Sequence, residues 1–173
     1  MATCNIIEPY LRSFSWRWML LTLLAAPSML PAQNKLAVND HQRLMSYVNT
    51  YDSQKLLTDP VVKPQLAHIM GPQLTHLESN LDVHGPLGVD GGGLTLRGNA
   101  EHRGGEEEGF VFVDLNSGEV YACLLTNGRF EVYGKQLKFD YLPDGVRHWI
   151  FLTWASVNLK GTQPPNVVMH PVR

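Results

Sequence analysis

The fold of this 173-residue chain is decided by residues 93–133, which read GLTLRGNAEHRGGEEEGFVFVDLNSGEVYACLLTNGRFEVY. Four segments in this stretch have the alternation or the apolar content of β-strands, namely 93–97, 110–115, 119–125 and 129–133. The turn sequences Asn-Ser-Gly at 116–118 and Thr-Asn-Gly at 126–128 connect the last three segments. Because turns this short join antiparallel strands, the sequence predicts an antiparallel meander.

A fifth strand is expected just before this stretch. Residues 83–89 are partly apolar, and Asp-Gly-Gly at 90–92 forms a tight turn into the next strand. Gly85-Pro86 interrupts the segment, which indicates an edge strand with a break or bulge. Residues 110–113 and 120–125 are apolar at consecutive positions, so we expect both faces of the middle strands to be covered.

Helical spacing precedes and follows the strands. Residues 39–57 place apolar side chains at three- and four-residue intervals, although this segment would also tolerate a short strand. Asp59-Pro60 indicates a helix start, and Pro64 moves that start toward its own position. Gly71-Pro72 separates two short helices. Residues 146–157 share an apolar stripe with two tryptophans, which predicts a C-terminal helix docked on the sheet.

These elements predict a single α+β domain over residues 33–160, with a five-stranded antiparallel meander and helices packed on one face. The tail at 161–173 contains Pro164, Pro165 and Pro171. We expect this tail to be disordered.

The first 32 residues have the order of parts of a signal peptide. Arg12 and Arg17 precede the apolar run 18–26, and small residues lead to a cleavage point after Ala32. This run is too short to cross a membrane, which takes about 20 apolar residues. The alternative is a buried core helix. The order of the parts favours export, so we expect a periplasmic or secreted protein with no membrane span after cleavage.

The charge limits the classes of partner, and the cysteine content limits the disulfide bonds that could stabilise the protein. The formal charge of −2 becomes −3 when the signal removes two arginines and one glutamate. This mild negative charge argues against nucleic acid as a partner. Cys4 leaves with the signal, so Cys123 has no partner for an internal disulfide. Since Cys123 lies in an apolar strand, we expect a buried, inert thiol.

The connection at 98–109, GNAEHRGGEEEG, is longer than the roughly two to five residues that paired strands need. Long polar loops often carry binding sites. We therefore expect His102, Arg103, Glu106 and Glu107 to be binding residues, with the glutamates facing a cationic partner. The alternative is that these side chains remain in water and repel one another.

Signatures of catalysis and of metal binding are absent from the sequence. It contains no HExxH, HxH or CxxC spacing and no GxSxG elbow. Gly91-Gly92-Gly93 joins strand to strand, which fits a turn better than a phosphate site. We expect no cofactor. One enzymatic alternative stays open, a small hydrolytic or metal-dependent enzyme that uses His102 and the loop glutamates.

The order of elements resembles the periplasmic lysozyme inhibitors of the Ivy type. The resemblance covers about residues 60–133 and is carried by Leu-Thr-Leu-Arg-Gly at 94–98, the loop with His102, and Val-Phe-Val at 111–113 before Gly118. It implies that family's fold and the inhibition of lysozyme. The family's inhibitory loop carries a disulfide-closed Cys-Lys-Pro-His-Asp-Cys motif. Here the loop has no cysteine, and only His102 matches the motif histidine.

The sequence thus favours an exported protein-binding module, such as an inhibitor or immunity-type protein, that acts on a cell-wall enzyme through residues 98–109. The expected partner is a protein, for example a cationic cell-wall hydrolase. The oligomeric state stays open.

Overall fold

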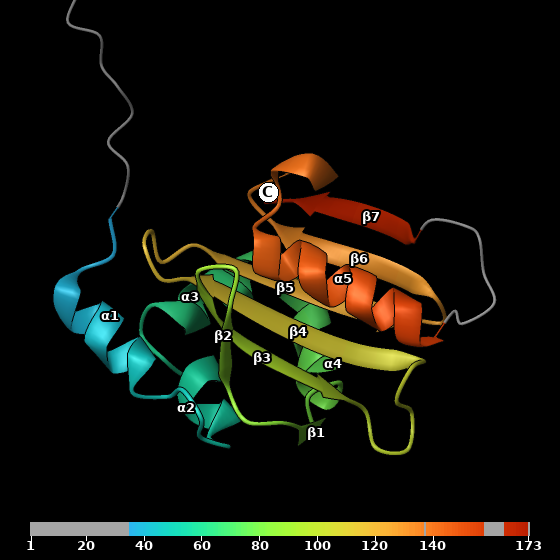
Figure 1. Ribbon diagram of the computed structural model, residues 1–173, viewed down its shortest axis with the longest axis horizontal. Helices are drawn as coiled ribbons and strands as arrows, with labels where there is room; N and C mark the ends of the chain where they lie inside the picture. The colour runs from blue at the N-terminus through green and yellow to red at the C-terminus, as the bar shows by residue number, and fades with distance from the viewer. Residues whose placement is uncertain (1–34, 137, 158–164, 173) are drawn as a thin grey trace, which may run out of the picture. The chain divides into compact units, whose positions relative to one another are not determined.

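The computed structural model describes residues 35–136, 138–157 and 165–172, which belong to one compact unit. Within these residues, five α-helices accompany one sheet (Figure 1). They are α1 (Val38–Met45), α2 (Ser53–Leu57), α3 (Val62–Met70), α4 (Leu74–Ser79) and α5 (Asp144–Val157), with short 3-10 turns at Gly71–Gln73 and Phe139–Tyr141.

The sheet confirms the α+β class and the antiparallel meander. Its strands are β1 (Val83–His84), β2 (Gly88–Asp90), β3 (Gly93–Asn99), β4 (Glu107–Asp114), β5 (Val120–Thr126), β6 (Arg129–Gly134) and β7 (Asn166–Pro171). The main order is β1-β3-β4-β5-β6-β7, and β2 also pairs with β3. The expected fifth strand is therefore two short edge strands, because Gly85 and Pro86 interrupt the pairing with β3.

Strand β7 lies in the C-terminal tail, which composition predicted to be disordered. It runs parallel to β6, with Phe130 opposite Val167 and Val132 opposite Met169. The helix α5 supplies the crossover that a parallel pair requires. Val167 and Met169 are partly buried against the core on the α5 side, so apolar burial orders this segment despite its prolines. The remaining tail residues, 161–164 and 173, lie outside the described residues.

Two apolar clusters cover the two faces of the sheet, as the consecutive apolar residues of the middle strands predicted. In β4, Val111 and Val113 belong to the cluster under α3 and α4, while Phe110 and Phe112 belong to the cluster under α5. The expectation that all helices lie on one face is therefore wrong, because α5 covers the opposite face (Figure 1). Successive side chains of a strand point to opposite faces, and in β4 both sets are apolar. Each face of the sheet therefore needs helices to cover it.

Trp149 anchors α5 on the sheet. Its ring stacks on Phe110, with ring centroids 5.2 Å apart and planes 10° apart, and meets Phe130 edge-on at 5.6 Å. Trp154 only reaches the margin of this cluster. Cys123 is fully buried in the same cluster, and burial raises the pKa of its thiol. This agrees with the expected inert thiol.

The sequence predicted a mainly helical segment over residues 39–57, but the structure divides this segment into α1 and α2. Between α1 and α2, the Asn49 N–H donates to Leu87 O at 2.8 Å, and the Leu87 N–H donates to Thr50 O at 2.8 Å. Asn49 adopts a positive φ of 63°. Pairing with the chain before β2 thus replaces the helical hydrogen bonds that these residues would otherwise make.

Asp59 lies just before α3, close to where the sequence predicted the helix start. Its Oδ1 accepts a hydrogen bond from the Val61 N–H at 2.8 Å, and Arg43 and Tyr47 also donate to its buried carboxylate. Burial raises the pKa of Asp59, but these hydrogen bonds outweigh burial and hold the pKa below its usual value. Pro64 lies in the first turn, where its missing N–H costs no helical bond.

The proposed signal peptide at 1–32 lies outside the described residues. Within the part that the structure describes, none of the helices is both long enough and apolar enough to cross a membrane.

Candidate functional site

The loop between β3 and β4 is shorter than the sequence predicted. The ladder extends through the pairs Gly98–Gly109 and Asn99–Glu108, which leaves residues 100–106 as the connection. A Cβ on Gly98 would lie 2.7 Å from Val83 O, and one on Gly109 would lie 3.0 Å from Asn80 O. These two glycines therefore allow β1 and the residues just before it to pack closely on the strand pair, and they belong to the sheet and not to the loop.

Backbone hydrogen bonds fold residues 100–106 into two successive turns. The Ala100 N–H donates to Glu107 O, the Arg103 N–H to Ala100 O, and the Glu106 N–H to Arg103 O, each at 3.0 Å. The Asn127 N–H also donates to Glu106 O at 2.9 Å, which braces the loop against the β5–β6 turn. The loop is therefore internally bonded without a disulfide.

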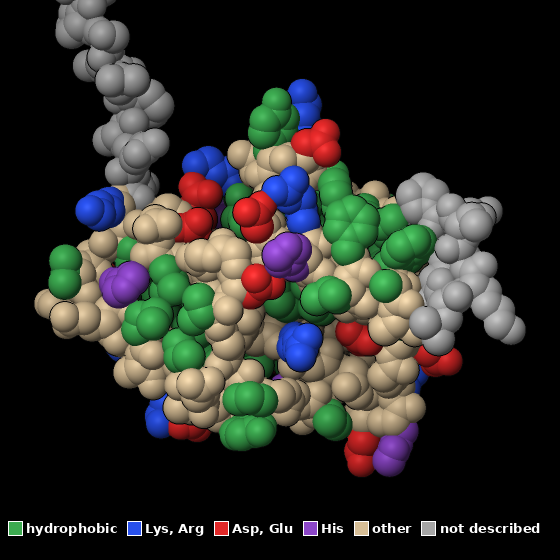
Figure 2. Space-filling model, viewed as in Figure 1, with side chains coloured by type: hydrophobic (Ala, Val, Ile, Leu, Met, Phe, Trp, Pro, Cys, Tyr) green, Lys and Arg blue, Asp and Glu red, His purple; other side chains and the backbone are tan. Residues whose placement is uncertain are grey.

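His102 lies at the tip of this loop. Its backbone is left-handed, with a φ of 58°, and its side chain is 90% exposed. A residue other than glycine is uncommon in this conformation. The nearest charged group is Glu101, whose Oε1 lies 3.4 Å from His102 Nε2 and whose side chain is 75% exposed. Acidic and histidine side chains project together from this end of the molecule (Figure 2).

Arg103 faces back toward the base of the loop. Its Nη2 lies 3.5 Å from Glu106 Oε2 and 3.5 Å from Glu107 Oε1. Glu106 is 66% exposed, so this carboxylate remains available to a partner. The four predicted binding residues therefore divide into His102 at the tip, Arg103 and Glu106 on the flank, and Glu107 at the base.

Glu107 does not lie in the loop, as the sequence interpretation placed it, but in β4 with its side chain only 8% exposed. Its Oε2 is 3.0 Å from His76 Nε2 and accepts hydrogen bonds from Thr126 Oγ1 at 3.2 Å and Asn80 Nδ2 at 3.4 Å. Burial raises the pKa of Glu107. These hydrogen bonds and the charge interaction with His76 lower it by more, so the net pKa lies below its usual value. Glu107 thus fastens the base of the loop to α4 and β5.

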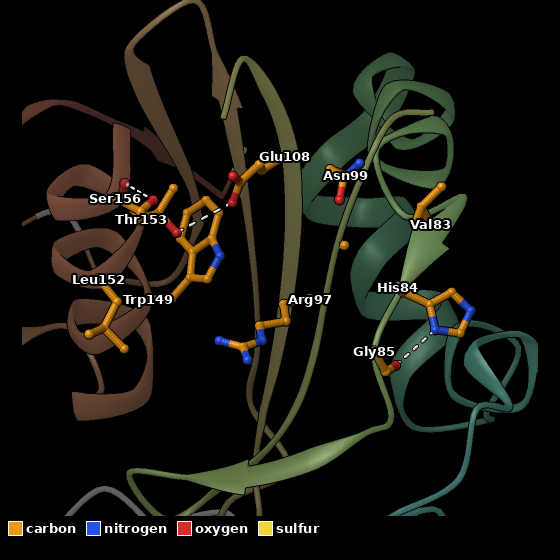
Figure 3. Close-up of a pocket in the computed structure, with 11 residues that line it drawn as sticks. Val83, His84, Gly85, Arg97, Asn99, Glu108, Trp149, Leu152, Thr153 and Ser156 are labelled. Atoms are coloured by element: carbon orange, nitrogen blue, oxygen red, sulfur yellow. Dashed lines mark hydrogen bonds between the residues drawn. The ribbon is translucent and has the colours of Figure 1, made fainter. Parts of the chain in front are cut away.

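Glu108 fastens the other side of the loop to α5. Its Oε1 accepts from the Gly105 N–H at 3.0 Å, and its Oε2 accepts from Thr153 Oγ1 at 3.4 Å (Figure 3). Gly105 has a φ of 85°, which favours glycine. Two consecutive glutamates with opposite orientations therefore hold the loop to the helices on both faces of the sheet.

The anchoring roles of Glu107 and Glu108 were missed in the sequence, although a signal was present. Extending the alternation of Val111 and Val113 back along the strand puts Glu107 on the α3–α4 face. The same extension from Phe110 puts Glu108 on the α5 face. His76 and Asn80 carry no comparable signal, because only the packing of α4 brings them to Glu107.

The structure does not bring His102 together with Glu106 or Glu107. Among the described residues, no group of three or more His, Cys, Asp or Glu side chains is placed to hold a metal ion. His102 instead stands beside one exposed carboxylate, Glu101, at the end of a braced loop. This geometry exposes the imidazole to solvent at the end of the loop.

Comparison with known proteins gives a family for this chain. Residues 61–154 match the family described as Inhibitor of vertebrate lysozyme (Ivy), which is more than half of the chain. No curated protein and no solved structure is similar enough to be matched. The matched range contains the strands β1–β6, the loop with His102 and most of α5. The chain therefore belongs to the Ivy family of lysozyme inhibitors.

Proposed function

We propose that this protein inhibits a lysozyme by inserting the loop 100–106 into the active-site cleft of the enzyme, with His102 as the leading side chain. The observation that carries the proposal is the placement of His102, 90% exposed in a left-handed conformation at the loop tip. Membership of the Ivy family supports lysozyme as the target, and the resemblance pairs His102 with the histidine of that family's loop motif.

The chemistry of a lysozyme active site fits an inserted imidazole. The enzyme holds two carboxyl groups across its cleft, one ionised and one with a pKa raised to about 6. An imidazole N–H donates a hydrogen bond in either protonation state. A bond from His102 to an ionised carboxylate would be charge-assisted and would occupy the position where substrate is cleaved.

Rigidity of the loop comes from noncovalent contacts in this chain. The family motif closes its loop with a disulfide, whereas here residues 100–106 are held by backbone bonds and by Arg103, Glu107 and Glu108. A loop already fixed in its bound conformation loses less entropy on binding, which improves affinity. Glu107 and Glu108 therefore support binding without contact to the enzyme.

The exposed acids beside His102 favour a cationic target. Glu101 is 75% exposed and Glu106 is 66% exposed. Complementary charge around a contact raises the association rate and its dependence on salt. Changing Glu106 would therefore slow association more than it would speed dissociation.

Export to the periplasm or outside the cell is part of the proposal, since lysozyme acts on the cell wall. It is supported by Arg12, Arg17 and the apolar run 18–26 before Ala32. The mass of the protein purified from the envelope or medium tests it. A chain that begins near residue 33 is expected, and a full-length chain retained in the cytoplasm would contradict export.

Titration of lysozymes with the protein tests the inhibition itself. Purified residues 33–173 are added to vertebrate-type, goose-type and invertebrate-type lysozymes during digestion of bacterial cell walls. We expect activity of at least one enzyme to fall in proportion to added protein until the two are equimolar. Full activity of all three enzymes at a tenfold molar excess would refute the proposed function.

A further inference from the structure

A groove on the α5 face of the sheet lies apart from the tip of the loop. Its volume is about 440 Å³, and it runs between α5 and the strands β1 and β3 (Figure 3). A second hollow of about 210 Å³ continues it toward β2, because both are lined by Arg97, Trp149, Leu152 and Thr153. Sites for small molecules span roughly 300–1,000 Å³, so the groove is large enough for one.

Arg97 stands out among the arginines of the described residues. Arg43, Arg103, Arg129 and Arg147 each form an ion pair with a carboxylate. Arg97 forms no ion pair and no side-chain hydrogen bond with any residue that the structure describes. Its guanidinium group extends from β3 into the groove, toward Trp149 (Figure 3). Its five donors are therefore left for water or for a ligand.

The guanidinium group selects the chemistry of that ligand. Its planar fork of N–H donors matches a carboxylate in two parallel hydrogen bonds. Trp149 and Leu152 form an apolar wall beside it. A small carboxylate with an apolar or ring-shaped body would therefore satisfy Arg97 and cover this wall.

The end of the groove that adjoins the loop has the reverse polarity. Glu108 lines it together with the amide of Asn99 and the hydroxyl of Ser156. A ligand carboxylate would be repelled by Glu108, whereas hydroxyl or amide N–H groups could donate to it. The groove is thus polarised, with a cation near its centre and acceptors at the end that adjoins the loop.

We propose that this groove binds a small organic acid that carries its carboxylate at one end and hydroxyl or amide groups at the other, with Arg97 holding the carboxylate. Acidic sugars and the carboxyl ends of short peptides both have this chemistry. The site goes beyond the proposed inhibition, because it lies on the α5 face and leaves His102 free.

Two matched pairs of probes test the proposal by NMR titration of residues 33–173. N-acetylmuramic acid is compared with N-acetylglucosamine, which lacks the lactyl carboxylate, and N-acetyl-trialanine is compared with its C-terminal amide. We expect at least one acid to shift the Trp149 indole signal and its neutral counterpart to bind at least tenfold more weakly. The acid that binds identifies the source of the carboxylate. Failure of both acids, or equal binding of a neutral counterpart, would overturn the proposal.

Arg97→Gln provides the residue-level test, with Arg147→Gln as its charge-matched control on α5. A charge-assisted bidentate contact predicts a loss of about tenfold or more in affinity for the acid in Arg97→Gln. Arg147 is already paired with Asp144 and does not line the groove, so its variant should bind within about twofold of the parent. Unchanged binding by Arg97→Gln would refute the site. The lysozyme titration, repeated with this variant, separates loss of the groove from loss of inhibition.

Discussion

His102→Ala is expected to raise the protein concentration needed for half-inhibition of lysozyme about 30-fold. This follows from a loss of about 2 kcal/mol, the size typical of a central contact in a protein interface. His102 is 90% exposed in the free protein and lies at the loop tip. Insertion of the loop would therefore bury its imidazole in the enzyme cleft. The change removes a hydrogen bond to an enzyme carboxylate and leaves that carboxylate without its partner. Inhibition curves of the parent and the variant measure the effect.

His68→Ala is the matched control for this change. His68 is exposed on α3, a helix on the opposite face of the sheet from α5. Neither substitution should alter the free energy of unfolding by more than about 0.5 kcal/mol, since both side chains are on the surface. If His102→Ala inhibits as strongly as His68→Ala, then His102 does not lead the contact with the enzyme.

Glu107→Ala is expected to lower the free energy of unfolding by about 2 kcal/mol, because it removes a buried carboxylate that accepts three hydrogen bonds. The affected groups are His76, Asn80 and Thr126, which all reach the Glu107 carboxylate. The neighbouring Glu106→Ala is the control, because Glu106 is 66% exposed and should cost less than about 0.5 kcal/mol. Urea denaturation of both variants measures the difference. Equal stabilities would show that Glu107 is no anchor.

The same anchor predicts a dependence on pH. The pKa of Glu107 is lower in the folded protein than its ordinary value, which is about 4.3 in an unfolded chain. Its contribution is therefore fully present above the unfolded pKa and is lost as pH falls through the lower folded pKa. The parent should lose more stability than Glu107→Ala between pH 6 and pH 3. The pKa of Asp59 is also lowered in the folded protein, so Asp59 adds a pH dependence of the same sign. Asp59 is present in both proteins, so its contribution cancels when their stabilities are compared. Parallel pH profiles would contradict this role.

Much of the sheet could be predicted because its signals are local. The alternation in β3 and the Asn-Gly turn before β6 each act over a few residues, and both appear in the structure where the sequence placed them. The break at Gly85-Pro86 is equally local, since proline cannot continue the pairing. Such features do not depend on the rest of the chain.

Elements that depend on distant contacts were not predicted. Strand β7 has a proline-containing sequence, and only its pairing with β6 and the burial of Val167 and Met169 make it a strand. The side of the sheet that α5 covers is also a property of the assembled core. Periodicity indicates that a face is apolar, but it does not say which element will cover that face.

The candidate site shows both cases. The long polar connection predicted a loop between the two strands that are now β3 and β4, and His102 lies in that loop. The sequence predicted binding roles for both Glu106 and Glu107, yet Glu106 is exposed whereas Glu107 is buried under α4. The next glutamate, Glu108, is held by Thr153 of α5. A variant that removes Glu107 together with His102 would therefore confuse stability with binding.

Competition at the enzyme cleft tests most directly whether the loop occupies the active site. The dissociation constant between this protein and a lysozyme that it inhibits is measured at increasing concentrations of a saccharide that fills the cleft. If the loop 100–106 enters the cleft, the saccharide and this protein compete for the same site. The apparent dissociation constant of the protein should then increase linearly with the concentration of free saccharide. A dissociation constant that stays the same at saturating saccharide would place the contact elsewhere and contradict the account.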